Sequence, residues 1–141
     1  MKNLSARLLA ALLIVLVASF PAVAADANVS AATLASEAWL AEIDQARYAE
    51  SWDDAAKVFR DAVPKSAWAT QAKAVRDPLG AVLHRELKTA RFTHSLPGAP
   101  DGDYVVIQYD TQFAQKAHAV ETVTPQKDAS GAWHVSGYYI R

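Results

Sequence analysis

Residues 103–113, DYVVIQYDTQF, decide the fold class of this chain. Apolar or compact side chains stand at every second position from Val105 to Phe113, and the positions between them are mostly polar. This alternation is typical of a β-strand with one buried face, because successive side chains of a strand point to opposite sides. We therefore predict a strand here, with the face from Val105 to Phe113 packed against the rest of the protein.

The same two-residue period continues after about Leu87 and predicts an antiparallel sheet. Four strands are expected, over 88–96, 103–113, 117–125 and 132–140. Residues with turn chemistry separate them, and Gly131 suits the left-handed position of a three-residue hairpin loop. That loop would set Asp128 opposite Ala132.

Before Leu87, apolar residues recur every three or four positions and predict helices. Three helices are expected, over 30–46, 51–63 and 66–76. Ser51, with Asp54 three residues later, is expected to cap the second helix, and the third is expected to end near Arg76. Residues 79–87 fit either a short helix or the lead-in to a strand. Helices followed by strands without crossover helices predict an α+β fold, with three N-terminal helices packed on a curved four-stranded antiparallel sheet.

Residues 1–24 have the pattern of a secretory signal peptide. A basic start precedes an apolar run over 8–18, and Ala22-Val23-Ala24 supplies the small residues that a signal peptidase recognises. The apolar run has 11 residues, whereas a membrane-spanning helix needs roughly 20. We therefore expect cleavage near Ala24 and a periplasmic or secreted protein that meets the membrane only transiently, through this peptide. Residues 25–33 are expected to be a flexible segment and 34–141 a single domain.

The composition of the mature chain narrows the classes of partner. Removal of residues 1–24 leaves 117 residues with 12 basic and 15 acidic side chains. A mildly acidic domain is a poor candidate for binding nucleic acid, so we expect no nucleic-acid partner. The chain has no cysteine, which excludes thiolate metal sites and cysteine nucleophiles. Its four histidines lack the spacing of a metal site, and we expect neither a metal nor a cofactor.

Glu121 is the chemically most informative residue of the predicted sheet. If the hairpin loop sets the register of the last strand pair, Tyr139 lies opposite Glu121, and a short preceding turn would place Tyr109 on its other side. The carboxylate would then stand on the apolar face, where a charged group needs partners. Two interpretations remain open: a structural acid paired with Arg85, Arg91 or a tyrosine hydroxyl, or an acid that orients a ligand or transfers a proton.

Aromatic residues supply the other candidates for a binding site. Four tryptophans in so short a chain suit either a ligand cleft or an ordinary core. The candidate ligand-binding residues are Trp39, Tyr48, Trp52, Arg85, Tyr109, Glu121 and Tyr139. Glu121 is also the candidate catalytic residue. Arg76 is expected to cap the carbonyls at the end of the third helix, although its guanidinium also suits a carboxylate.

Several spaced motifs resemble one family of small exported bacterial proteins, domain of unknown function 4019. The residues that carry the resemblance are Trp39, Asp44, Tyr48, Ser51-Trp52, Trp68, Arg76-Asp77-Pro78-Leu79-Gly80, Arg85, Leu96-Pro97-Gly98, Pro100-Asp101-Gly102, Tyr104, Glu121-Thr122-Val123, Trp133, Val135 and Gly137-Tyr138. The resemblance covers 34–141 and implies export and a single compact domain, without an activity or catalytic residues to carry over. It also implies a glycine shortly after Asp44, where this chain has Gln45-Ala46-Arg47, which weakens the expectation of a sharp helix end there. At the level of the fold, the arrangement is similar to the cone-like nuclear-transport-factor-two-like or cystatin-like folds, which host enzymes, ligand binders and dimerising modules alike.

These observations leave three functions open. The first is a non-enzymatic binding module for a small amphipathic ligand or a periplasmic protein, with a pocket beside Glu121. The second is a small enzyme of the hydrolase or isomerase type that uses Glu121 or Asp110 as a general base. The third is an interaction module that forms a homodimer through the outer face of the sheet. The apolar patch predicted there comprises Tyr104, Val106, Val120, Tyr138 and Ile140.

Overall fold

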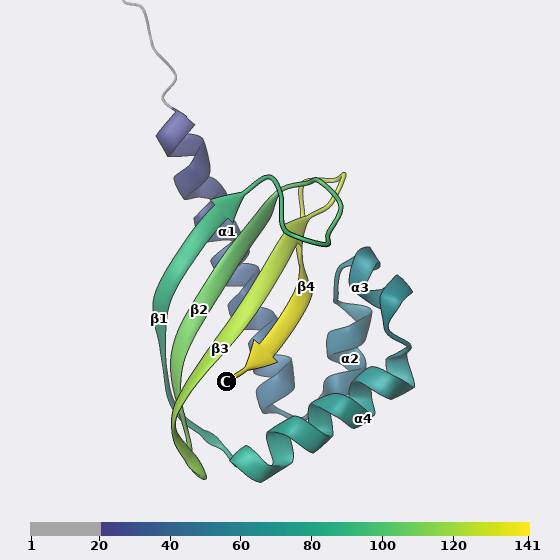
Figure 1. Cartoon of the computed structure of the whole chain (residues 1–141), viewed down its shortest axis with the longest axis vertical. Coiled ribbons are helices and arrows are strands. Elements are labelled where there is room, and N and C mark those ends of the chain that lie inside the picture. Colours follow the sequence, from purple (N-terminus) through teal and green to yellow (C-terminus); the bar gives the residue numbers. More distant parts are fainter. Residues whose placement is uncertain (1–20) are drawn as a thin grey trace, which may run out of the picture.

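Helices occupy the first half of the described chain and strands the second (Figure 1). The computed structural model describes residues 21–141, so that most of the predicted signal peptide, residues 1–20, lies outside the described residues. The elements are α1 (Pro21–Asp44), α2 (Tyr48–Asp53), α3 (Lys57–Ala62), α4 (Lys65–Arg76), a 3-10 turn η1 (Asp77–Leu79), β1 (Val82–Thr93), β2 (Tyr104–Phe113), β3 (Lys116–Lys127) and β4 (Trp133–Ile140). The predicted α+β class and the four antiparallel strands are confirmed.

The described residues form four α-helices where the sequence predicts three. The predicted helix over 51–63 is divided, because Ala56 is extended and donates its N–H to the carbonyl of Val135 in β4 at 2.8 Å. Ser51 is not the predicted cap: it lies inside α2, and its hydroxyl donates to the carbonyl of Tyr48 at 2.8 Å. A contact with the sheet therefore overrides the local helical pattern.

α1 begins earlier than the sequence predicts. Residues 25–33, expected to be flexible, are helical, and Ala32 is fully buried. Asn28 is also held, because its side-chain oxygen accepts a hydrogen bond from the Lys127 ammonium at 3.1 Å. No helix of the described chain is both long and apolar enough to cross a membrane.

α1 ends sharply at Asp44 although no glycine follows. Ala46 takes the left-handed conformation, with φ +57°, which glycine adopts more easily. Its N–H donates to the carbonyl of Ile43 at 3.0 Å, and the N–H of Arg47 donates to the carbonyl of Glu42 at 2.9 Å. The chain thus reverses direction here at the expense of a strained alanine.

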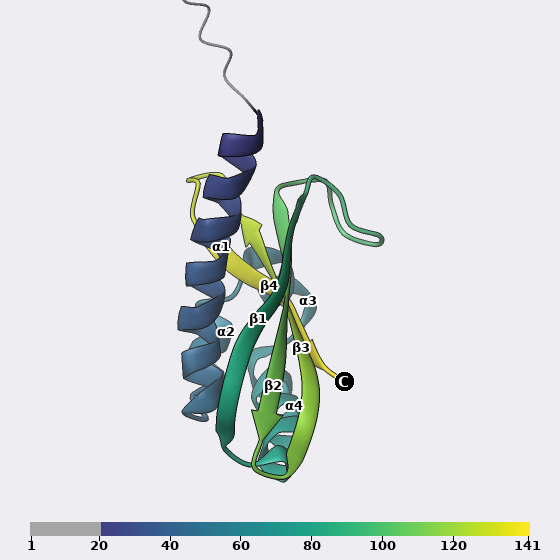
Figure 2. The ribbon, with the colours of Figure 1, turned by 90° about the vertical axis from the view of Figure 1, so that its left-hand side faces the viewer.

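The sheet has the strand order β1-β2-β3-β4, and α1 packs across one of its faces (Figure 2). α2, α3 and α4 lie beyond the β4 edge (Figure 1). The face of β2 that the sequence predicts to be buried is buried, and Val105 and Ile107 are both fully inaccessible. These residues share one core with Leu40 and Ile43 of α1. The core therefore lies between α1 and the inner face of the sheet.

Two predicted strand pairings are confirmed. Tyr109 pairs with Glu121, although the β2–β3 hairpin starts with Phe113 opposite Lys116 and shifts its register between Phe113 and Thr111. The β3–β4 hairpin starts as expected, because the N–H of Asp128 donates to the carbonyl of Ala132 at 2.7 Å around a loop with Gly131 at φ +89°.

The register of β3 and β4 then shifts at one β-bulge. Pro125 pairs with Val135, but the next pair is Thr124 with Gly137, so Ser136 is an extra residue of β4. The bulge lies opposite Pro125, which has no N–H to donate to the ladder. Every residue of β4 after Ser136 therefore lies one position away from its predicted partner.

The bulge reverses the faces of the last residues of β4. Glu121 pairs with Ile140, whereas Tyr139, its predicted partner, pairs with Thr122 and is 53% exposed on the outer face. Tyr138 points inward instead, and its hydroxyl reaches Glu121. The predicted apolar patch on the outer face is therefore wrong, because Tyr138 and Ile140 belong to the inner face.

The strained end of α1 gives a direct test of this reading of the fold. Ala46→Gly is expected to stabilise the protein by about 0.5–1 kcal/mol, because glycine takes a positive φ without steric cost. Ala41→Gly, at an exposed position inside α1, is the matched control and is expected to destabilise by about 1 kcal/mol. Urea unfolding of the two variants measures both changes, and destabilisation by Ala46→Gly would contradict the left-handed helix end.

Candidate functional site

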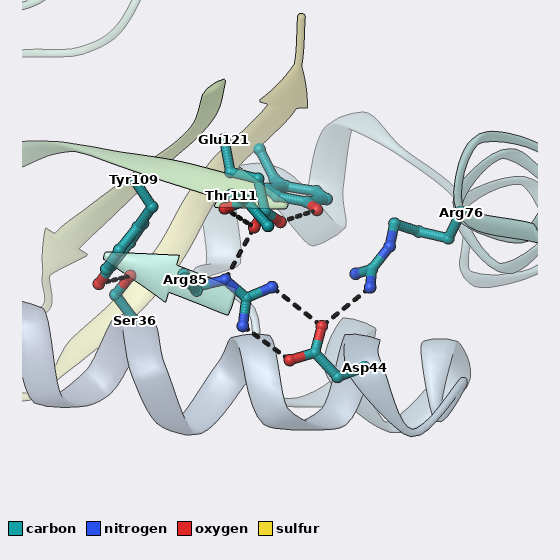
Figure 3. A network of polar contacts seen from close by, with 8 residues as sticks. Ser36, Asp44, Arg76, Arg85, Tyr109, Thr111 and Glu121 are labelled. Carbon is teal, nitrogen blue, oxygen red and sulfur yellow. Dashed lines mark hydrogen bonds and ion pairs between the residues drawn. The ribbon is translucent and has the colours of Figure 1, made fainter. Parts of the chain in front are cut away.

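Glu121 is fully buried in the core, and both of its carboxyl oxygens accept hydrogen bonds (Figure 3). Oε1 accepts from the Arg85 Nε at 2.7 Å and from the Thr111 hydroxyl at 2.6 Å. Oε2 accepts from the Tyr138 hydroxyl at 2.5 Å. Burial of a carboxylate is costly unless such partners are present, and here three donors replace water. The carboxyl group is thus held by β1, β2 and β4 at once.

Arg85 connects this buried acid to the helices. Its Nη1 and Nη2 donate to the two carboxylate oxygens of Asp44, at 2.7 Å and 3.0 Å, a bidentate geometry that suits a guanidinium. Arg76, at the end of α4, donates from Nη2 to Oδ1 of the same Asp44 at 2.9 Å. We call Glu121, Arg85, Asp44 and Arg76 the charged ladder. It ties β3, β1, α1 and α4 together and contains two positive and two negative groups.

The ladder also determines how its members ionise. Burial works against the charge of Asp44, but hydrogen bonds from Arg85 and Arg76 hold the pKa of its carboxyl below the ordinary value. Burial opposes the charge of Arg85 as well, yet its bonds to Asp44 and Glu121 raise its pKa. Burial and then the charge of Glu121 raise the pKa of Tyr138, so its hydroxyl remains a donor.

The structure brings together some of the candidate residues inferred from the sequence. Arg85 and Glu121 form an ion pair, in agreement with the structural interpretation of this acid. Tyr109 lies beside Glu121 in the sheet, but its hydroxyl shares a hydrogen bond of 3.2 Å with Ser36. Trp39 is a core residue whose ring packs edge-on against that of Tyr138, with centroids 5.3 Å apart.

Three other candidates lie away from the carboxyl group. Tyr48, in α2, is buried in the core. The indole N–H of Trp52 donates to the carbonyl of Val63 at 2.7 Å, which identifies it as a packing residue of the α2–α3 region. Tyr139 lies on the outer face, because the bulge at Ser136 reverses the faces of the residues that follow it. Tyr139 therefore does not lie on the side of the sheet where Tyr109 and Glu121 lie.

Three residues of the network, Asp44, Thr111 and Tyr138, were missed. The expected role of Arg76 as a helix cap is wrong and the alternative, contact with a carboxylate, is observed, since its guanidinium donates to Asp44, 32 residues earlier in the chain. Tyr138 was missed because the bulge could not be foreseen, and Thr111 because a threonine on a buried face looks like an ordinary strand residue. Asp44 and Arg76 both belong to the motifs that carry the family resemblance. Nothing in the sequence, however, indicated that their side chains contact each other.

A cleft of about 230 Å³ lies between α4 and the end of β4, and we call it the α4–β4 cleft. It is lined by Trp68, Gln71, Ala72, Val75, Arg76, Tyr138, Tyr139 and Ile140. Arg76 is 5% exposed at its side chain, and its Nε and Nη1 atoms are buried without a hydrogen-bond partner among the described residues. Buried donors of this kind are rare, because each unpaired donor costs free energy.

The β4 side of this cleft is a free strand edge. Arg141 and Val120 exchange both of their backbone hydrogen bonds, at 2.9 Å and 3.1 Å. Because such pairs alternate along an antiparallel ladder, the backbone N–H and C=O groups of Tyr138 and Ile140 point away from β3. Nearer the start of β4, Ala56 covers the edge, but within residues 21–141 no backbone group bonds to Tyr138 or Ile140 from that side.

Comparison with known proteins now gives the family. A family model described as "Protein of unknown function (DUF4019)" matches residues 35–138. The chain belongs to this family. The predicted resemblance is thereby confirmed, whereas a search of the curated proteins found no match. The matched region of the DUF4019 domain contains the whole charged ladder and most of the α4–β4 cleft. The family description names no activity.

Two larger hollows of the DUF4019 domain are less suited to a ligand. One of about 600 Å³ lies between the α2–α3 turn and the β3–β4 hairpin, and some of its charged residues already pair with one another, as Lys57 does with Asp61. The other, of about 470 Å³, lies around Asp110, which pairs with Lys88. Among the described residues no group of histidines and acids is arranged to hold a metal ion.

Glu42 and Asp54 form a pair of acidic groups that the sequence did not single out. Oε1 of Glu42 accepts from Arg47 at 3.2 Å, but Oε2 is buried without a partner in the described chain. Burial and then the charge of the nearby Asp54 raise the pKa of Glu42. The pair borders a hollow of about 250 Å³ beside Trp39. We assign it no ligand, because acidic groups alone do not define a site.

The charged ladder of the DUF4019 domain predicts a large and specific effect of Arg85. Arg85→Met leaves Glu121 buried with a charge that is no longer compensated, and is expected to destabilise by about 3–5 kcal/mol. The control is Lys88→Met on the same strand, which breaks the exposed pair with Asp110 and should cost less than about 1 kcal/mol. Free energies of unfolding in urea measure both, and equal losses would show that the ladder does not support the fold.

The raised pKa of Glu42 predicts a pH-dependent penalty. Above its folded pKa the carboxylate is held in an unfavourable site, and this penalty disappears as the pH falls and the group is protonated. Glu42→Gln is therefore expected to stabilise the domain at pH 7, with a gain that shrinks toward pH 4. Glu37→Gln, on the exposed side of α1, is the control and should change the stability little. A gain for Glu42→Gln that does not depend on pH would contradict the assignment.

Proposed function

We propose that this DUF4019 domain is an exported binding module that takes an extended peptide segment of a partner protein into the α4–β4 cleft. The observation that carries the proposal is the free edge of β4 at Tyr138 and Ile140, next to an apolar cleft. A free strand edge presents alternating N–H and C=O groups, which an incoming strand satisfies by pairing with them. Side-chain pockets beside such an edge supply the specificity.

The size and lining of the cleft favour one side chain of a peptide. Pockets for small molecules are typically about 300–1,000 Å³, whereas this cleft holds about 230 Å³. Its lining is mostly apolar, with Trp68 and Ala72 on α4 and Ile140 on β4. Val75 and Tyr139 at its rim are 51% and 53% exposed, and an added strand would cover them. An aliphatic side chain is the best match to this surface.

The other functions that the sequence left open have less support. A small ligand beside Glu121 would have to enter a fully buried site whose carboxyl oxygens already accept three hydrogen bonds. The same contacts weigh against Glu121 as a general base, because a base needs access to its substrate. Asp110 is exposed and paired with Lys88. A homodimer through the outer face has less support, because Tyr138 and Ile140 of the predicted apolar patch lie on the inner face.

Export forms part of the proposal and rests on the signal-peptide pattern of residues 1–24. A binding module outside the cytoplasm would meet other exported chains, including unfolded or extended segments. The cone-like comparison with nuclear-transport-factor-two-like or cystatin-like folds is compatible with this role, since such folds host binding modules, but it does not select it.

The proposal is tested by NMR titration of protein expressed with residues 1–24, recovered from the periplasm, and checked for an N-terminus at Ala25. The probe is a capped seven-residue peptide of alternating threonine and apolar residues, with leucine at its centre. Binding is expected to shift the amides of Tyr138 and Ile140 and the indole N–H of Trp68. Ile140→Pro removes one N–H of the free edge without touching the pairing with β3, and should weaken binding about tenfold or more.

Controls distinguish strand pairing from non-specific hydrophobic binding. The same peptide with proline at alternate positions cannot pair and is expected not to bind. Lys88→Met, at the opposite edge of the sheet, should bind as the parent protein does. Shifts confined to other surfaces, or unchanged binding by Ile140→Pro, would overturn the proposal. So would concentration-dependent shifts of the same amides without peptide, because they would show that a second copy of the chain covers the edge.

A further inference from the structure

We infer that the segment bound in the α4–β4 cleft places a second side chain, an aromatic one, in a hollow of about 330 Å³ between α3 and the loop that joins β1 to β2. We call this space the loop hollow. The inference rests on the proposed function and deepens it, because it gives the partner segment a sequence pattern of one aliphatic and one aromatic residue. It follows from the position of the loop hollow, from its lining and from Gly137 in its floor.

The loop hollow and the α4–β4 cleft lie on opposite sides of the same strand edge. The cleft takes in the inner-facing Tyr138 and Ile140, and the hollow borders Gly137, just before them in β4. Gly137 pairs with Thr124, whose neighbour Val123 is in the core, so the hollow is on the outer side. Figure 2 shows the loop between β1 and β2 on the side of the sheet away from α1. An extended chain on the β4 edge therefore passes both spaces.

Two aromatic rings make the loop hollow and the cleft direct neighbours. Phe59 of α3 lines the hollow and Trp68 of α4 lines the cleft, and the rings meet edge to face with centroids 5.1 Å apart. Nearer the start of β4 the edge is closed by Ala56, whose N–H bonds to Val135. A segment that leaves the cleft in that direction is therefore turned to the outer side, where the loop hollow lies.

The lining of the loop hollow is uncharged and still accessible. None of the described residues that border it carries a charge. Val58, Phe59 and Leu96 are half-buried and Pro97 is exposed, so their side chains have apolar surface left to cover. A charged side chain would lose water here without gaining a partner of opposite charge. An apolar side chain would instead remove apolar surface of both molecules from water.

Hydrogen bonds hold the loop wall of the hollow in place. The Tyr104 hydroxyl donates to the carbonyl of Pro100 at 2.7 Å, and the side-chain amide of Gln126 donates to the Tyr104 oxygen at 3.1 Å. The N–H of Gly102 donates to the carbonyl of His94 at 3.0 Å and closes the loop at its base. Because the wall already has its shape, binding requires little further ordering of the loop.

Gly137 indicates that an aromatic side chain is the best match. It leaves the outer face of β4 without a side chain at this position, and an added Cβ would lie 3.9 Å from the Thr124 Cβ, an ordinary contact. Its φ is not positive, so the backbone itself does not require a glycine here. An aromatic ring on a neighbouring strand covers the exposed backbone of such a glycine. The loop hollow is also larger than the cleft, at about 330 Å³ against about 230 Å³.

Strand geometry sets the spacing of the two side chains. Successive side chains of an extended segment point to opposite sides, and the cleft and the loop hollow lie on opposite sides. The β4 residues Tyr138 to Ile140 at the cleft follow Gly137 at the hollow by one to three positions. The aliphatic and the aromatic residue are therefore one or three positions apart, whereas a spacing of two would direct both toward the cleft.

The experiment places a phenylalanine in turn at each position of the seven-residue probe except the central leucine. Affinities are measured by NMR titration of the native protein. Phenylalanine one or three positions from the leucine, on one side of it, is expected to tighten binding about tenfold and to shift the amides of Gly137 and Thr124. Phenylalanine two positions away is expected to give no gain. An equal gain at a spacing of two, or a gain without shifts of these amides, would overturn the inference.

A variant of the native chain tests the loop hollow directly. Gly137→Val fills its floor and is expected to fold, because valine suits a strand and the added Cβ makes an ordinary contact with Thr124. Urea unfolding checks this. The ratio between the affinities of the phenylalanine probe and the parent probe is expected to fall from about tenfold to about one. Lys88→Met, at the opposite edge of the sheet, is the matched control and should keep the full ratio.

The two proposals fail in different ways. If neither the parent probe nor any phenylalanine version binds, the proposed function fails. If the parent probe binds at the free edge but no phenylalanine version binds more tightly, only the role of the loop hollow fails. A tenfold ratio that persists in Gly137→Val also contradicts that role alone.

Discussion

The buried carboxyl group of Glu121 is the constraint on which the rest of this structure depends. A carboxylate at zero exposure must be surrounded by donors, and the donors come from elements that are distant in sequence. Arg85 is one of them, and its remaining N–H groups require a second carboxylate, which Asp44 supplies from the end of α1. Asp44 in turn fixes Arg76 and with it the end of α4. One acid thus determines how the helices are placed against the sheet.

The bulge at Ser136 links this network to the proposed binding edge. Without the extra residue, Tyr138 would lie on the outer face and Glu121 would lose a donor. With the extra residue, the Tyr138 hydroxyl donates to Glu121, and the last residues of β4 lie next to α4 with an unpaired backbone edge. Bulges commonly re-aim side chains and end strand pairing near functional sites. The same irregularity therefore gives Glu121 one of its donors and sets the orientation of the β4 residues that line the α4–β4 cleft.

The parts of the fold that could be predicted are those set by local patterns. The alternation in β2 identified the buried face, and Gly131 placed the second hairpin, while Glu121 was recognised because an acid on an apolar face needs partners. The bulge could not be predicted, since a single extra residue leaves no periodic signal and reverses every later side chain. Contacts such as Asp44 with Arg76 depend on how helices pack, which no pattern along the chain encodes. The sequence therefore predicted Glu121 and its pairing with Arg85, but not the contacts that Asp44 and Arg76 supply from the helices.

The charged ladder in this core is not explained by its contribution to stability alone. Buried ion pairs can often be replaced by apolar residues of similar volume without loss of stability, so stability alone is weak grounds for a ladder of four. An apolar replacement of Asp44 and Arg76 could fill the same space, but it would lose the directional contact that joins the end of α1 to the end of α4. The ladder therefore helps to determine where α4 lies against the sheet, and with it the position of the α4 wall of the α4–β4 cleft.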